Sequence, residues 1–176
     1  MRQVDSPKTA LLLAAHMTAA EIYESVTNGG ATDFAELVTV LNRNKPRCLI
    51  GGLAVNCYVE PVYTVDVDLV VVAANLEQIG RELEAAGFRL SSELNVQFTT
   101  DARYQDFLAG ATERQVLGLA VPVASLQEIV RGKVWAWQDK ERRSTKRKKD
   151  KLGLMRIAEA HPKLRGLIPA EIVKQL

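Results

Sequence analysis

Two aspartates separated by a single residue, Asp66 and Asp68, are the side chains of this sequence best suited to chemistry. They interrupt an apolar, β-branched run from Thr64 to Val72 that is typical of a buried strand. Alternate strand residues point to the same face, so we expect the two carboxylates side by side. Neighbouring anions in apolar surroundings repel each other and lose hydration, and a divalent cation, Mg²⁺ or Mn²⁺, would compensate. The structural alternative is that one aspartate only ends the strand in a turn.

Two glycines, Gly51 and Gly52, follow the predicted short strand 47–50 upstream of the aspartates. Glycines after a strand let a ligand approach the backbone closely, and the start of a following helix favours an anion. A phosphate-binding turn beside a metal site is the minimum needed for phosphoryl or nucleotidyl transfer, in which metal ions stabilise the attacking and leaving oxygens. The combination therefore indicates a nucleotide-dependent transferase.

The charge of the chain is concentrated in one segment. With 176 residues, 47% hydrophobic and 25% charged, the composition fits one globular domain with a net charge of +2. Residues 140–151 contain eight Lys or Arg against Glu141 and Asp150, which leaves the rest of the chain acidic. Such a segment can face phosphates, or it can be a solvated helix face.

Cysteine usage and hydropathy indicate a cytoplasmic protein. Cys48 and Cys57 fit small buried residues in a reducing compartment, and no run of 18 apolar residues predicts a membrane span. Residues 9–20 faintly resemble a signal peptide, but Asp5 and His16 favour an N-terminal helix instead.

Hydrophobic periodicity and breaker residues predict alternating helices and strands. Asn75 is expected to cap one helix, Gly87 to end it, and Ser125 with Glu128 to form a capping box. We expect helices at about 8–26, 34–42, 53–59, 75–86, 126–138, 145–160 and 169–175. We expect strands at about 47–50, 64–72, 95–100 and 113–123, the last broken by Gly118 and Pro122.

These elements predict an α/β (α+β) fold, a mixed β-sheet flanked by helices with a helical C-terminal portion. Residues 1–30 are expected to form a helical extension and residues 31–123 the core. Residues 124–176 are expected to pack on that core as one compact unit.

The motifs 49–55 and 64–69 resemble the signature of the DNA polymerase β-like nucleotidyltransferase superfamily. The greatest similarity is to AbiEii-type and minimal nucleotidyltransferases of bacterial toxin–antitoxin and phage-defence systems. Segments 125–133 and 146–150 extend the similarity, which covers residues 47–155. The resemblance implies a nucleotidyltransferase-like fold. It also implies transfer from an NTP to a hydroxyl of a protein or RNA, and an antitoxin or other partner subunit.

The resemblance also assigns roles to residues. Asp66 and Asp68 would be catalytic metal ligands, and Asp150 would orient a basic group. Its other implied residues bind the triphosphate or neutralise phosphates: Gly51, Gly52, Thr64, Lys133, Lys146 and Lys149. The alternatives are a surface lysine with a buried stem at position 133 and a helical i, i+4 pair between Asp150 and Lys146.

The sequence departs from the family at the third carboxylate, which lies on a later strand and completes the metal site. Strand 95–100 offers Gln97 and Thr99 instead. Asp101, at its end, is the best replacement and completes the predicted catalytic set, and Asp106 is a weaker one. A further departure is Val62, where many relatives carry an arginine.

Each of three further sequence features is compatible with two interpretations. Segment 98–107 is either a long hairpin connection whose aromatic residues pack back, or part of the nucleotide or acceptor site. Trp135 and Trp137 point to different helix faces and suit core packing and an interface, or base stacking. Gly153 replaces an aspartate common in relatives and marks either a helix kink or a degenerate motif.

Three functions compete on this basis. The leading hypothesis is a metal-dependent nucleotidyltransferase. The second is a catalytically degenerate nucleotide-binding or partner-binding module of the same fold. The third is a basic nucleic-acid-binding protein in which the aspartate pair is structural.

Overall fold

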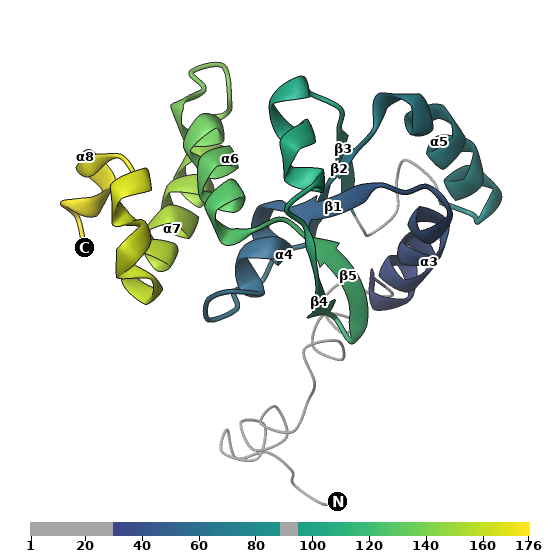
Figure 1. Cartoon of the computed structure of the whole chain (residues 1–176), viewed down its shortest axis with the longest axis horizontal. Coiled ribbons are helices and arrows are strands. Elements are labelled where there is room, and N and C mark those ends of the chain that lie inside the picture. Colours follow the sequence, from purple (N-terminus) through teal and green to yellow (C-terminus); the bar gives the residue numbers. More distant parts are fainter. Residues whose placement is uncertain (1–29, 89–94) are drawn as a thin grey trace, which may run out of the picture.

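A five-stranded mixed sheet forms the centre of the protein in a computed structural model that describes residues 30–88 and 95–176 (Figure 1). The strand order is β3-β2-β1-β5-β4, with β1 antiparallel to β2 and parallel to β5. β2 is parallel to β3, and β4 is antiparallel to β5. The strands are β1 (Arg47–Ile50), β2 (Asp66–Val71), β3 (Asn95–Thr99), β4 (Thr112–Val116) and β5 (Leu119–Val123). The predicted α/β class with a mixed sheet is confirmed.

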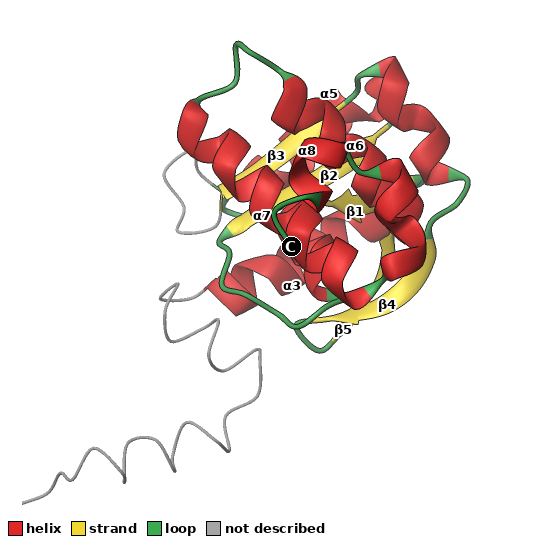
Figure 2. Cartoon of the chain, turned by 90° about the vertical axis from the view of Figure 1, so that its left-hand side faces the viewer, coloured by secondary structure: helices red, strands yellow, loops and turns green. Residues whose placement is uncertain are grey.

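The helices lie in two groups at opposite ends of the sheet. Figure 1 shows α3 (Gly30–Arg43) and α5 (Leu76–Ala85) at one end, and these two helices contact each other. At the other end α4 (Gly51–Asn56), α6 (Leu126–Gln138) and α7 (Ser144–Ala160) pack together. Figure 2 looks onto this C-terminal group with the strands behind it. The remaining helical turns are η1 (Ala73–Asn75), η2 (Ala102–Leu108), η3 (Pro162–Leu167) and α8 (Ala170–Val173).

Burial alternates along the first four residues of β2. In β2, Val67 and Leu69 are fully buried, whereas Asp66 and Asp68 on the opposite face are only partly covered. This is the arrangement expected of a strand with one apolar face in the core and one face on a cavity. The largest fully buried side chains are Phe34, Phe107, Leu37, Leu41, Leu49, Leu69, Ile79, Ile129, Leu154, Ile157, Ile172 and Val55.

Local signals placed most helix ends correctly. The capping box of Ser125 and Glu128 is confirmed. Gly87 adopts a positive φ of 91° and ends α5 through the two backbone bonds of a Schellman motif, as predicted. Asn75 holds the N-cap position of α5, as predicted, but its side chain makes no capping bond and donates to the carbonyl of Lys45.

Several boundaries differ from the prediction. α4 begins at Gly51 rather than at residue 53, and β2 is limited to Asp66–Val71. The region 113–123 is a hairpin of β4 and β5 that turns at Leu117 and Gly118, both with positive φ, and Pro122 lies inside β5. Segment 98–107 is not a hairpin connection, because β3 and β4 lie at opposite edges of the sheet.

The predicted N-terminal helix 8–26 lies outside the described residues. Within residues 30–88 and 95–176, no helix has the length and apolarity needed to span a bilayer.

Candidate active site

A cavity of about 460 Å³ lies where β2 and β3 face α4, α6 and α7. Nearly all residues predicted from the sequence motifs to form the site line this cavity, although they come from segments far apart in the sequence. The predicted site residues that line it are Gly51, Gly52, Thr64, Asp66, Asp68, Lys133, Lys146 and Lys149. Asp101 does not line it.

Asp66 opens β2 and has a hydrogen-bond donor on each carboxylate oxygen. Asn95 of β3 donates to Oδ1 at 2.7 Å, and Lys146 of α7 donates to Oδ2 at 3.0 Å. Partial burial works to raise the pKa of Asp66. The bonds from Lys146 and Asn95, with the charges of Lys146 and Lys149, outweigh that effect, so this pKa lies below its ordinary value. Asp66 is therefore held as an anion.

Asp68 packs directly on the backbone of Gly51. The register between β1 and β2 places Ile50 opposite Asp68, so the glycine that follows β1 meets the carboxylate. Gly51 has a φ of +71°, and a Cβ at this position would lie 2.0 Å from Asp68 Oδ2. Burial, and after it the neighbouring charge of Asp66, raises the pKa of Asp68. Only glycine fits this close approach.

Asp150 forms the second charged centre of the cavity. It is buried in α7 and accepts from Lys133 Nζ at 3.1 Å and from Arg142 Nε at 2.9 Å. The predicted role of orienting a basic group therefore has a structural basis. The helical pair with Lys146 does not form, because Lys146 reaches Asp66 instead. Lys133 is not a surface lysine, since its side chain is only 11% exposed.

Gly153 makes room for this ion pair. α7 continues through it without interruption, so the glycine marks no break in the helix. A Cβ there would lie 2.9 Å from Cε of Lys133 and 3.3 Å from its Nζ. The absence of a side chain lets Lys133 cross α7 to reach Asp150.

Three residues of the site were missed from the sequence. Asn95 binds Asp66 only because β3 pairs with β2 in a register that sets these two residues opposite each other. Arg142 belongs to the basic run, but nothing local indicates its bond to Asp150. Arg156 lines the cavity and binds Asn56 and the carbonyl of Glu60, which fastens the loop after α4 to α7.

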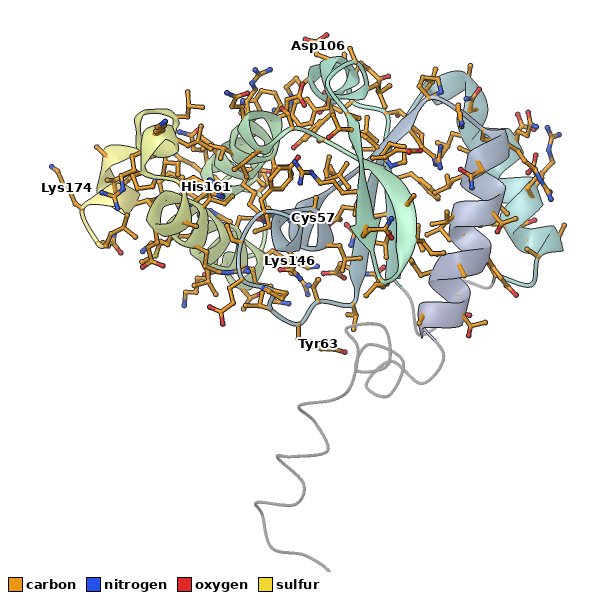
Figure 3. All side chains as sticks on the ribbon, turned by 60° about the horizontal axis from the view of Figure 1, so that its bottom comes forward. Cys57, Tyr63, Asp106, Lys146, His161 and Lys174 are labelled. Carbon is orange, nitrogen blue, oxygen red and sulfur yellow. The ribbon has the colours of Figure 1, made fainter. Side chains whose placement is uncertain are left out.

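The structure does not bring Asp101 to the aspartate pair. Its carboxylate caps η2 and binds Arg103 at 2.7 Å, in an exposed position outside the cavity. Figure 3 shows Asp106 at the top edge of the molecule, away from Lys146, and Asp106 does not line the cavity. Among residues 30–88 and 95–176, no group of three or more His, Cys, Asp or Glu is placed to hold a metal ion. Gln97 and Thr99 of β3 line the cavity instead.

The aromatic residues beside the cavity form a packed cluster. Trp135 meets Tyr104 edge to face at 5.3 Å and stacks on Phe107 at 6.0 Å between ring centroids. Trp137 also packs against the core, and its carbonyl accepts from Arg147. Segment 98–107 thus packs back through its aromatic residues, as one interpretation predicted, while its members Phe98, Thr99 and Tyr104 also line the cavity.

No protein-family model matches this chain, and no curated protein does. Among solved structures it is similar to the solution structure of the antibiotic-resistance factor ANT(2'')-Ia, a nucleotidyltransferase. The TM-score is 0.56 at 15% sequence identity, over 82% of this chain and 91% of the other. The fold is nucleotidyltransferase-like. The closer resemblance to AbiEii-type proteins stays a prediction.

The donor set suits a hard cation that is shared with a ligand. Asp66 and Asp68 supply carboxylate oxygens, which Mg²⁺ prefers, from the same face of β2. Mg²⁺ commonly takes one or two protein carboxylates and completes its shell with water and substrate phosphates. Lysine and arginine side chains in the same cavity supply the positive charge that phosphates require.

Proposed function

We propose that this protein is a metal-dependent nucleotidyltransferase that transfers a nucleotidyl group from an NTP to a hydroxyl of a protein or RNA. One observation carries the proposal. Asp66 and Asp68 stand on the same face of β2 inside a cavity lined by cations, and Asp68 packs on Gly51. These residues supply two carboxylates for a cation and positive charge for phosphates, and they lie on a fold of the nucleotidyltransferase type.

Each part of the cavity has a task in this reaction. Asp66 and Asp68 would hold Mg²⁺ or Mn²⁺, which neutralises charge on the transferring phosphoryl group when it is bound. Gly51 and Gly52 pack against Asp68 and Thr64, and their backbone at the start of α4 would bind the incoming phosphates. The basic side chains Lys133, Lys146, Lys149 and Arg142 compensate the charge of the triphosphate.

The test is transfer of label from an α-labelled NTP in the presence of Mg²⁺ or Mn²⁺. A cell extract and total RNA serve as acceptors, and pyrophosphate release is followed in parallel. We expect Asp68→Asn, which keeps the size of the side chain, to abolish both signals. Lys148→Met is the matched control, because Lys148 is exposed and lies outside the cavity. Transfer that survives Asp68→Asn would refute the assignment.

A second candidate is a nucleotide-binding or partner-binding module that no longer transfers. The position of Asp101 favours it, since the predicted third carboxylate is bound to Arg103 outside the cavity. Such a protein binds NTP and metal but releases no pyrophosphate. Salt-dependent RNA binding without NTP binding would indicate the basic nucleic-acid-binding protein instead.

The biological setting that we propose is a toxin-like component of a toxin–antitoxin or phage-defence system, with an antitoxin or other partner subunit. The AbiEii-type motif resemblance supports it. Induced expression of the wild-type chain should arrest bacterial growth, and expression of Asp68→Asn should not. Equal growth of both strains, with both proteins present in soluble form, would contradict this setting.

A further inference from the structure

The ammonium group of Lys146 binds Asp66, one of the two carboxylates proposed to hold a cation. Its Nζ lies 3.0 Å from Oδ2, and the side chains of Lys146 and Asp66 are only 25% and 18% exposed. The pair joins β2 to α7 across 80 residues of sequence. Asp66 is thus already neutralised by a side chain of the protein.

The two hydrogen-bond donors to Asp66, Asn95 and Lys146, differ in how easily they can move away from its carboxylate. Asn95 is fixed by backbone pairing of β3 with β2 and carries no charge. Lys146 is attached by a flexible four-carbon stem and carries a full charge that a phosphate also attracts. A divalent cation would compete with the charge of Lys146 at Oδ2, whereas the uncharged Asn95 can stay bound to Oδ1.

Most of the other cationic side chains of the cavity already bind groups of the protein. Lys133 and Arg142 share Asp150, and Arg156 binds the loop after α4. Among the residues that the structure describes, the side chain of Lys149 has no hydrogen-bond or ion-pair partner. Lys146 and Lys149 are therefore the cations that can turn toward a triphosphate without breaking up the centre at Asp150.

We propose that Lys146 couples divalent-cation binding to triphosphate binding, by neutralising Asp66 until a triphosphate draws it away. The inference rests on the proposed function of the cavity and adds an order of events to it. Before the nucleotide arrives, Lys146 keeps the affinity of the aspartate pair for a divalent cation low. When Lys146 moves to the phosphates, Asp66 becomes available to the cation that accompanies them.

The first experiment measures Mn²⁺ binding to the full chain without nucleotide, by titration calorimetry. We expect Lys146→Met to bind Mn²⁺ about tenfold more tightly than the wild type, because a partly buried competing charge is gone. Lys148→Met, on an exposed part of the same helix, should match the wild type. Adding Asp66→Asn to Lys146→Met should remove the gain. A misfolded variant would not gain affinity, so the readout separates this role from a structural one.

The second experiment measures binding of inorganic tripolyphosphate in EDTA. Lys146→Met should bind it about tenfold more weakly than Lys148→Met, since one phosphate contact is lost. The proposal is overturned if Lys146→Met binds Mn²⁺ no better than the wild type, or if no variant binds Mn²⁺. It is also overturned if tripolyphosphate binding does not depend on Lys146. Failure of the proposed function would look different, with both titrations as expected and no pyrophosphate released from NTP.

Discussion

Replacing Gly51 by alanine tests the closest contact of the site. The substitution forces a side chain into the left-handed region at φ +71°, which costs roughly 1–2 kcal/mol. The new Cβ would also lie 2.0 Å from Asp68 Oδ2 and 2.9 Å from its Cβ, so Asp68 must move. Overpacking of this kind costs about 1–3 kcal/mol. We expect Gly51→Ala to lower the free energy of unfolding by about 2–5 kcal/mol, a large part of the ~5–15 kcal/mol typical of a folded domain.

Gly118→Ala is the matched control for this experiment. Gly118 also has a positive φ, +84°, but a Cβ there meets no atom within 4 Å. Gly118→Ala should therefore lower the free energy of unfolding only by the backbone cost of a positive φ, about 1–2 kcal/mol. Urea unfolding followed by circular dichroism measures both variants under the same conditions. If Gly51→Ala is no more destabilised than Gly118→Ala, the packing of Asp68 on Gly51 is refuted.

Four further predictions concern other features of the structure. Gly80→Ala, whose Cβ meets nothing within 4 Å, should stabilise its helix by roughly 0.8–1 kcal/mol. Gly153→Ala should instead displace Lys133 and weaken tripolyphosphate binding; unchanged binding in calorimetry would contradict this. Asp101→Asn should keep nucleotidyl transfer at the wild-type level, and a loss in the labelling assay would restore Asp101 as the third carboxylate. Burial, with a smaller effect of a nearby carboxylate, raises the pKa of the Cys48 thiol to about 12. Iodoacetamide should therefore label Cys48 only after unfolding, as peptide mass spectrometry can show.

The parts of the fold and site that could be predicted depend on residues close together in the sequence. Asp66 and Asp68 alternate in an apolar run, so their common face follows from strand geometry alone. The capping box of Ser125 and Glu128 depends on residues three apart, and it forms as expected. Gly51 stands directly after a strand, where a close approach to the backbone is a general expectation.

The parts that could not be predicted depend on partners far away in the sequence. By the local rule Lys146 would pair with Asp150 in the same helix, but packing of α7 on the sheet brings it to Asp66. Asp101 was a reasonable third carboxylate by position. Its carboxylate instead binds Arg103 and caps the start of η2, outside the cavity.

The sequence by itself determined the chemistry that is available: two carboxylates on one strand face, glycines before them and a concentrated basic segment after them. Tertiary structure alone decided which charges meet. The alternation and spacing of apolar residues show which face of a strand or helix is apolar. This is enough to predict the strands and helices. The pairing of Asp66 with Lys146 and Asn95, and of Asp150 with Lys133, depends on strand register and on how α6 and α7 pack. These are set by burial summed over the whole core, which no short motif contains.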